Sequence, residues 1–379
     1  MKKLLLFIFS FFSFLLAVNA DELNLHAKSA ILIEESTGKV IYENNADEQL
    51  RPASMTKIMS LLLIMDALDN NKVSLTDTVT ISKTSSDMGG SQVYVNEGEV
   101  YTVGELLKGV AIASANDAVV ALSEKIAGSK EKFVINMNNK ANELGLKNTH
   151  FVNPHGLDED NHYSSARDMS IMARELLKHK DILNYTSKYE DYFKKNNGSS
   201  IWLVNTNKLV KFYKGMDGLK TGYTSKAGYC LTATAKRDSL RFISVVMGED
   251  SIENRSEDTL KLLNYGFNTI KKEVIMKKDT ILDKKTYKLS NKDKVNVYLK
   301  EDIVKIYDIN SSKVNFSYEL HYKNNINLPI NKNSKVGYIE LKLDDGTTIK
   351  QDLIIKEEVS KIKFFNLFKK NVNIVSSGL

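Results

Sequence analysis

Residues 51–59 read RPASMTKIM, and the apolar run SLLLIMDAL follows directly at 60–68. This stretch predicts a helix over about 54–70 that buries its apolar side chains. Ser54 and Lys57 stand three residues apart, so they share a helix face at the edge of a buried segment. A serine hydroxyl becomes a good nucleophile when a neighbouring base takes its proton, and a lysine whose ammonium is disfavoured by burial can be that base.

The spacing of Ser54 and Lys57 is weak support when it stands alone. Three other serine–lysine pairs in the chain have the same spacing, and turns or solvated faces account for them. These pairs are Ser36–Lys39, Ser129–Lys132 and Ser360–Lys363. A catalytic interpretation therefore needs further residues that would meet Ser54 and Lys57 in the fold.

A second element lies in AIASANDAVV at residues 111–120, which holds the chain's only Ser-x-Asn, Ser114 and Asn116. The two polar residues interrupt an apolar run that a helix would bury, and buried polar side chains need hydrogen-bond partners. One interpretation is a capped break between two helices. The other is catalytic: Ser114 would relay a proton while Asn116 orients Lys57 and the substrate amide.

A third element is MDGLKTGYTSKAGYC at residues 216–230, with the chain's only Lys-Thr-Gly at Lys220, Thr221 and Gly222. The glycines of this stretch suit a strand edge where another group approaches the backbone closely. Lys220 would add positive potential near Lys57, and Thr221 would bind a carboxylate. A lone tripeptide of this kind would be an ordinary surface hairpin.

Helical and strand patterns together predict an α+β domain over residues 21–272. Residues 28–44 read as two strands around a Ser-Thr-Gly turn, and 227–248 as a hairpin with its turn at 238–239. Because helices are inserted between these strands, the sheet would be assembled from both ends of the domain. The predicted helices cover 54–70, 103–127, 131–145, 167–179 and 256–270.

The sequence texture changes at about residue 273, where short alternating runs predict a small all-β domain over 273–355. The stretch DDGT at 344–347 marks a hairpin turn within it. The predicted strands are TYKLS at 286–290, VNVYLK at 295–300, VKIYDI at 304–309, VNFSYELHY at 314–322, KVGYIELKL at 335–343 and IKQDLIIK at 349–356.

The two ends of the chain predict export and attachment to a membrane surface. Residues 1–20 carry two lysines, an apolar run and small residues before a cut after Ala20, which is the pattern of a signal peptide. An uncleaved anchor is the alternative, although the apolar run is short for a span. Residues 356–379 predict a basic amphipathic helix on the outer face of the cytoplasmic membrane. The alternative there is a helix docked on the β domain.

Composition narrows the possible functions. The chain has 379 residues, of which 42% are hydrophobic and 26% charged, so it can bury a sizeable core. Its net charge of +6 is mild and no basic stripe with interleaved aromatics occurs, which argues against nucleic acid as a partner. The single cysteine, Cys230, allows no internal disulfide. His150, His155 and His162 have spacings that fit a loop rather than a metal site, so no metal is predicted.

The three motifs in this order form the set found in penicillin-binding proteins and class A β-lactamases. In particular, the chain resembles the low-molecular-mass penicillin-binding proteins that are D-alanyl-D-alanine carboxypeptidases of peptidase family S11. The likeness is close over residues 25–270, and the β domain and tail match in layout only. The stretches that carry this likeness are RPASMTKIM, GSQVYVNEGEVYTVGELLKGVAIASANDA, FVNPHGLDEDNHYSSARDM, MDGLKTGYTSKAGYCLTATAKR and VVMG.

This resemblance implies an antiparallel sheet flanked by helices and a carboxypeptidase that needs no cofactor. Ser54 would attack the carbonyl between the two D-alanines of a peptidoglycan stem peptide, with Lys57 as general base. Ser114 would pass the proton to the leaving amine, and the backbone N–H groups of Ser54 and Tyr223 would form the oxyanion hole. β-Lactams would acylate Ser54 because they imitate the dipeptide. The residues implied to bind substrate are Lys220, Thr221, Gly222 and Arg255.

The chain departs from these relatives at a few positions. The middle motif is Ser-Ala-Asn where Ser-Gly-Asn is commoner, and Tyr223 stands where some relatives carry His. Only the backbone of Tyr223 is needed, so the implied catalysis is unaffected. The segment before Arg255 also differs from these relatives.

Three alternatives to a carboxypeptidase deserve comparison. A serine β-lactamase shares the motifs but uses a Glu-x-x-Leu-Asn, and the nearest match, ELGLKN at 143–148, has Lys147 where Asn should be. A non-catalytic penicillin sensor or wall-binding protein is disfavoured because every catalytic position carries the expected residue. A transpeptidase or endopeptidase would use the same site, and the choice depends on which acceptor the cleft admits.

Overall fold

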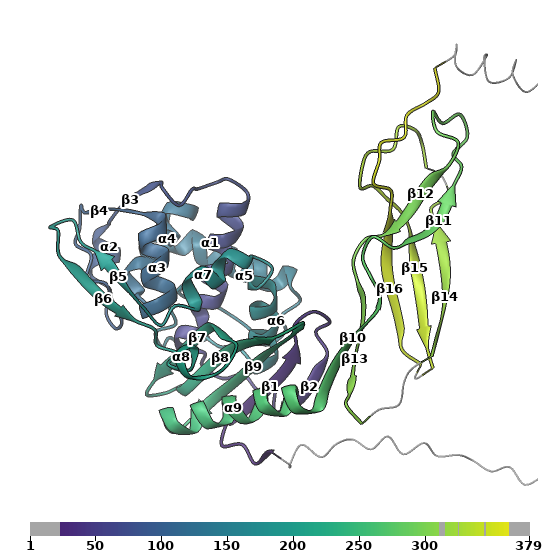
Figure 1. Cartoon of the computed structure of the whole chain (residues 1–379). Helices are drawn as coiled ribbons and strands as arrows, with labels where there is room; N and C mark the ends of the chain where they lie inside the picture. Colours follow the sequence, from purple (N-terminus) through teal and green to yellow (C-terminus); the bar gives the residue numbers. More distant parts are fainter. Residues whose placement is uncertain (1–22, 311–314, 325, 345, 364–379) are drawn as a thin grey trace, which may run out of the picture. The chain divides into compact units, whose positions relative to one another are not determined.

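The computed structural model describes residues 23–310, 315–324, 326–344 and 346–363 (Figure 1). These residues form two compact units that divide between Phe267 and Asn268. The predicted signal peptide over 1–20 lies outside the described residues. Within the described part of the chain, no helix is both long and apolar enough to cross a membrane.

The first unit is built on an antiparallel sheet with strand order β2-β1-β9-β8-β7. β1 pairs with β9 along its whole length, from Ser29 opposite Met247 to Glu34 opposite Phe242. This pairing confirms that the sheet is assembled from both ends of the domain. The strands are β1 (Ser29–Glu34), β2 (Val40–Asn44), β7 (Met216–Thr224), β8 (Gly228–Arg237) and β9 (Leu240–Glu249).

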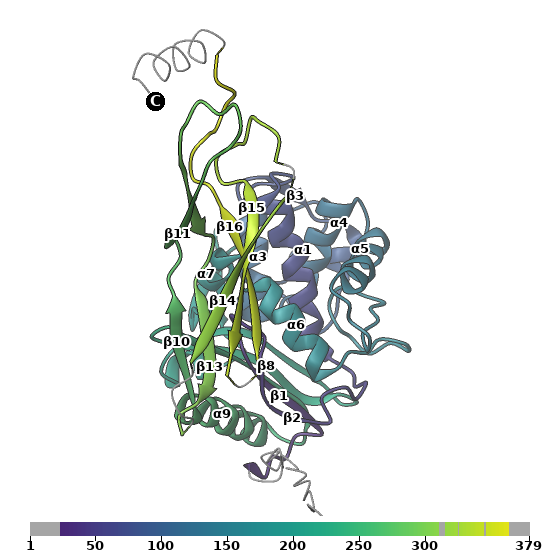
Figure 2. The same cartoon turned by 90° about the vertical axis from the view of Figure 1, so that its right-hand side faces the viewer.

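Helices cover both faces of this sheet, with α9 along one face and the other long helices on the opposite side (Figures 1 and 2). The five predicted helices are confirmed, except that the segment predicted over 103–127 is broken at Ser114 into two helices. The long helices are α1 (Lys57–Asp69), α3 (Val103–Ala113), α4 (Asn116–Ala127), α5 (Lys130–Glu143), α6 (Ala166–Leu176) and α9 (Ile252–Thr269).

Shorter elements complete the first unit. A two-stranded hairpin that the sequence interpretation missed, β5 (Glu190–Lys194) with β6 (Ser200–Val204), packs on α3. Neither EDYFK nor SIWLV alternates apolar and polar residues, so neither shows the period of two that predicts a strand. The remaining elements are η2 (Ala53–Thr56), β3 (Thr78–Thr80), α2 (Lys83–Ser86), β4 (Val100–Thr102), η3 (Lys180–Ile182), α7 (Leu183–Thr186) and α8 (Leu209–Phe212).

The second unit has its own apolar core and consists of strands. A five-stranded antiparallel sheet has the order β11-β12-β16-β15-β14, and β10 pairs with β13 separately. The predicted turn at 344–347 connects β15 to β16. The strands are β10 (Ile270–Met276), β11 (Ile281–Lys285), β12 (Val295–Leu299), β13 (Ile303–Asp308), β14 (Phe316–Tyr322), β15 (Lys335–Leu343) and β16 (Thr348–Ile354).

Two predictions for this unit need correction. The strand predicted at 286–290 is wrong: β11 ends at Lys285, and Leu289 has a φ of 58°, a left-handed conformation that cannot continue a strand. The helix predicted over 356–379 does not include residues 356–363. Val359 is instead fully buried and exchanges two backbone hydrogen bonds with Ile330, so tertiary pairing overrides the helical pattern there. Residues 364–379 lie outside the described residues.

Candidate active site

Ser54 lies on a tight turn that two other segments hold from either side. The turn is the 3-10 helix η2, and Ala53 before the serine has a φ of 47°. A Cβ added to Gly222 of β7 would come within 2.6 Å of the Pro52 carbonyl oxygen. A Cβ added to Gly156 would come within 1.9 Å of the Ala53 carbonyl oxygen. Glycine at both positions therefore allows the backbones to clamp the turn that carries Ser54.

Lys57 is fully buried at the start of α1 and is surrounded by acceptors. Its Nζ lies 3.0 Å from Ser54 Oγ, 2.6 Å from Asn116 Oδ1 and 2.8 Å from the carbonyl oxygen of His155. Burial, followed by the positive charge of Lys220, holds the pKa of Lys57 well below its usual value. A neutral amine in this position could take a proton from Ser54.

Ser114 and Asn116 occupy the junction of α3 and α4. Ser114 has a φ of 65°, which ends α3 and turns the chain into α4. Asn116 donates through Nδ2 to the Gly89 carbonyl at 2.7 Å, which directs its Oδ1 toward Lys57. Ser114 Oγ is buried and has no hydrogen-bond partner among the described residues. The break between two helices therefore occurs without a side-chain cap on α4, and Asn116 makes the contact with Lys57.

Lys220 and Thr221 lie on β7, the edge strand that faces the turn. Lys220 is buried and donates to the Thr221 carbonyl at 3.0 Å. Burial, together with the charge of Arg255, lowers the pKa of Lys220 to about 7. Thr221 Oγ1 donates to Thr206 Oγ1 at 2.7 Å, which ties β7 to the segment that follows β6. The β7 side of the site thus presents a hydroxyl next to a cation.

Tyr223 and Arg255 border the same strand. The ring of Tyr223 is exposed and stacks on Tyr229 with centroids 4.3 Å apart, so its side chain points away from the turn. Arg255 lies on α9 and is mostly buried, and burial lowers its pKa. The charge of Arg255 lowers the pKa of Lys220, so the two cations lie in one electrostatic neighbourhood. Such a pair would attract a carboxylate.

The loop that carries the histidines contributes a contact that the sequence interpretation missed. Residues 150–163 form an irregular loop, as predicted, and the His155 carbonyl accepts from Lys57. His162 Nδ1 accepts from the Val152 N–H, so Nε2 carries the proton and donates to Thr56 Oγ1 at 2.7 Å. Burial lowers the pKa of His162 to about 4, which keeps the ring neutral. The backbone role of His155 leaves no residue-type signal in the sequence.

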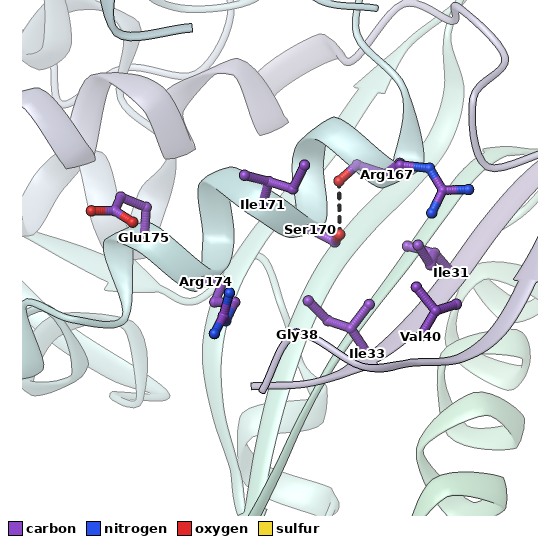
Figure 3. A pocket seen from close by; sticks show the side chains of 9 residues that line it. All are labelled: Ile31, Ile33, Gly38, Val40, Arg167, Ser170, Ile171, Arg174 and Glu175. Carbon is purple, nitrogen blue, oxygen red and sulfur yellow. Dashed lines mark hydrogen bonds between the residues drawn. The ribbon is translucent and has the colours of Figure 1, made fainter. Parts of the chain in front are cut away.

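A separate cavity of about 190 Å³ lies between α6 and the β1–β2 hairpin (Figure 3). Its arginines are already paired: Arg174 donates to two backbone carbonyls of the hairpin turn, and Arg167 binds Glu43 and Asp47. Ser170 donates to the Arg167 carbonyl, as the dashed line in Figure 3 shows. None of the residues that line this cavity belongs to the three motifs.

The arrangement defines a class of protein. A serine beside a buried lysine, with Ser-x-Asn and Lys-Thr-Gly converging on them from a helix junction and an edge strand, is the site of penicillin-recognising acyl-serine enzymes. Residues 16–251 match the family model of peptidase S11, D-alanyl-D-alanine carboxypeptidase, and residues 271–361 match the C-terminal domain of penicillin-binding protein 5. The chain belongs to the S11 family of D-alanyl-D-alanine carboxypeptidases.

Individual relatives agree with this family over most of the chain. D-alanyl-D-alanine carboxypeptidase DacF of Bacillus subtilis is 45% identical over 93% of this chain and 90% of its own. Penicillin-binding protein 5 of Haemophilus influenzae superposes with a TM-score of 0.72 at 32% identity, covering 89% of this chain and 98% of its own. Penicillin-binding protein D2 of Listeria monocytogenes, solved in an ampicillin-bound form, gives 0.58 at 33% identity, covering 64% and 98%.

Proposed function

We propose that this protein is a serine D-Ala-D-Ala carboxypeptidase that removes the terminal D-alanine from peptidoglycan stem pentapeptides. The observation that carries the proposal is the 3.0 Å contact between Ser54 Oγ and the Nζ of a fully buried Lys57. A lysine with a lowered pKa in that position has the geometry and the basicity of a general base. Family membership and the DacF relative support the same activity.

Acylation follows from the positions of four residues. Lys57 takes the proton of Ser54 Oγ, and the oxygen forms a bond to the carbonyl carbon between the two D-alanines. The C–N bond then breaks, and Ser114, whose buried hydroxyl has no partner among the described residues, passes the proton to the leaving amine. Asn116 holds Lys57 in place through its 2.6 Å contact. D-Alanine departs, and Ser54 is left as an ester of the shortened stem.

Deacylation uses the same base. Lys57 takes a proton from water, and the hydroxide adds to the ester carbonyl. The Oγ–C bond then breaks as Lys57 gives that proton to Oγ, which restores Ser54 and releases the tetrapeptide stem. Backbone N–H groups of Ser54 and Tyr223 would stabilise the oxyanion in both steps, worth about 3–4 kcal/mol per donor. The contact of Gly222 with the turn supports this pairing, because Gly222 directly precedes Tyr223.

Substrate selection would depend on the cations of the site. Lys220 and Arg255, with the Thr221 hydroxyl, would bind the terminal carboxylate of the stem, which places the D-Ala-D-Ala bond over Ser54. The shared electrostatic neighbourhood of Lys220 and Arg255 supports this assignment. β-Lactams would bind in the same way through their own carboxylate. Their leaving amine stays tethered, so the acyl-enzyme would persist.

An intact-mass time course with benzylpenicillin tests the proposal, followed by assay of D-alanine release from a stem pentapeptide. We expect one lasting adduct and D-alanine release, both lost in Ser54→Ala. Rapid loss of penicillin without a lasting adduct would instead indicate a β-lactamase. Neither adduct nor turnover would indicate a non-catalytic binding protein. Aminolysis products formed with an added acceptor amine would show a transpeptidase.

The proposed location is the outer face of the cytoplasmic membrane. The signal-peptide pattern of residues 1–20 supports export, and the basic amphipathic pattern of the C-terminal segment supports peripheral attachment. From that side the protein would reach the stem peptides of the peptidoglycan. No nucleic acid partner and no cofactor enter this proposal.

A further inference from the structure

The β5–β6 hairpin exposes a pair of aromatic side chains next to the site. Tyr192 and Trp202 stand directly opposite each other in the ladder, and they are 56% and 58% exposed. The other face of the hairpin is buried in the core through Phe193 and Leu203. The large rings therefore lie on the solvent side of a strand pair whose packing side is already filled.

The indole of Trp202 makes one hydrogen bond on the exposed face of the hairpin. Its Nε1 donates to Glu190 Oε2 at 3.2 Å along the same face of the hairpin. The exposed side chains of Lys194 and Ser200 form the next pair of the ladder. An aromatic face with a carboxylate, an ammonium and a hydroxyl around it has the composition that recognises a sugar ring, whose apolar C–H face stacks on the indole while its hydroxyl and acetamido groups hydrogen-bond.

The hairpin packs against the part of the unit that carries the site (Figure 1). Both strands pack on α3, which ends at Ser114. Lys195, just after β5, donates to the Tyr94 carbonyl and pairs with Glu99. At the other end, β6 leads to Thr206, whose hydroxyl accepts from Thr221 of the Lys-Thr-Gly motif. The aromatic pair thus has a fixed position relative to the site.

The distance also fits a polymeric substrate. Trp202 precedes Thr206 by four residues, so the chain between their Cα atoms spans at most about 13 Å. An extended stem pentapeptide spans about 17 Å between its terminal D-alanine and the sugar to which it is joined. A stem whose carboxylate lies at Thr221 can therefore bring its own sugar onto the hairpin.

We propose that Tyr192 and Trp202 form a subsite for the glycan strand that carries the stem peptide. The inference rests on the proposed function, because it assumes that the stem is the substrate of Ser54. It makes the protein prefer stems on glycan over free stem peptides. The alternative is a purely structural role, in which the two rings only stabilise the hairpin as a cross-strand pair.

Kinetics with two substrates separates these possibilities. We would measure kcat/KM for D-alanine release from a free pentapeptide and from the same pentapeptide on its disaccharide. The wild type should favour the disaccharide form by about five- to tenfold, mostly through KM. Trp202→Thr should lose that preference and keep the free-pentapeptide value, since threonine preserves strand propensity. Tyr318→Thr, an exposed aromatic on β14 of the second unit, is the matched control.

Two kinetic results would overturn the subsite. One is a wild type without preference for the disaccharide form. The other is a Trp202→Thr variant that retains the preference. Thermal melting of both variants shows whether the fold is kept, and a variant that melts early would be replaced by Trp202→Tyr with Tyr192→Thr.

Fluorescence gives a test that does not depend on catalysis. Trp202 is the only tryptophan of the chain, so its emission reports on this face alone. Titration with soluble glycan strands stripped of their stems should change the emission saturably, and Tyr192→Thr should weaken binding. Unchanged emission up to millimolar sugar would overturn the subsite. If the wild type instead binds glycan but releases no D-alanine, the proposed function fails while the subsite stands.

Discussion

At the scale of single residues, the unusual feature is a pair of buried lysines that meet no carboxylate in direct contact. Lys57 and Lys220 are both almost fully buried, and their hydrogen bonds go to neutral oxygens. Each therefore has a lowered pKa, since burial without an ion pair disfavours the ammonium. Burial without an ion pair costs electrostatic stability, and it leaves Lys57 available as a neutral amine at lower pH than an exposed lysine.

Replacing Lys220 should change the pH dependence of acylation. Lys220 lowers the pKa of Lys57. Lys220→Met should therefore raise the pKa of Lys57, so that its neutral amine forms only at higher pH. The rising limb of the acylation rate should therefore move to higher pH. Because the pKa of Lys220 is about 7, the lysine carries its charge mainly below that pH, where the two profiles should differ most.

The measurement is the second-order rate of acylation by benzylpenicillin between pH 5 and 10, values chosen to bracket the usual range of perturbed lysines. Lys226→Met, an exposed lysine at the turn between β7 and β8, is the control and should leave the profile in place. If the rising limb of the Lys220→Met profile stays at the wild-type pH or moves to lower pH, the electrostatic coupling of the two lysines is contradicted.

At the scale of elements, the site depends on backbones that touch the η2 turn. The loop at 150–163 contacts it through Gly156, and β7 contacts it through Gly222. His162 binds Thr56 within the turn itself. Ser54 is therefore positioned by non-local contacts, and these contacts also maintain the local conformation of Ala53, with its positive φ.

Gly156→Ala tests whether the close contact with Ala53, rather than the positive φ of the glycine, decides activity. The new methyl would meet the Ala53 carbonyl at 1.9 Å, so the turn must shift, and acylation should fall by about 100-fold or more. Gly128→Ala is the matched control: its φ of +83° is close to the +89° of Gly156, yet nothing lies within 4 Å of an added Cβ. That variant should lose about 1 kcal/mol of stability and no activity.

Stopped-flow acylation and thermal melting of the two variants, measured side by side, check this prediction. Equal acylation rates in both variants would show that the turn tolerates the displacement. Equal loss of activity in both would show that the left-handed backbone, rather than the contact with Ala53, decides the effect.

At the scale of the whole molecule, two units with separate cores share the chain. The complete set of motif residues lies in the first unit, and the second has an apolar core that extends to Val359. A truncation that begins at 358 would therefore damage that core. The described residues end at 363, so a deletion of 364–379 removes no residue of that core.

Deleting residues 364–379 should release the protein from membranes and leave acylation unchanged. The tail carries apolar residues at helical spacing among lysines, so the bound fraction should fall by about tenfold on liposomes that contain anionic lipid. Sedimentation of mature protein with such liposomes measures this. Phe365→Ser with Phe368→Ser should weaken binding likewise, whereas Asn371→Ser should not. A truncated protein that still sediments would contradict membrane attachment by the tail.

The family, five helices and a sheet drawn from both ends of the domain were predictable from the sequence. These features depend on local periodicity, residue type and motif order, which a sequence displays directly. The surroundings of the motifs could be read only from the folded chain. Contacts between distant segments place the His155 carbonyl against Lys57 and leave one face of the β5–β6 hairpin exposed. They also decide that the break at Ser114 brings Asn116 to Lys57. The end of the chain shows the same limit, because Val359 follows a helical pattern and yet pairs with Ile330. A backbone contact has no side-chain signature, and pairing across the fold can override a local pattern.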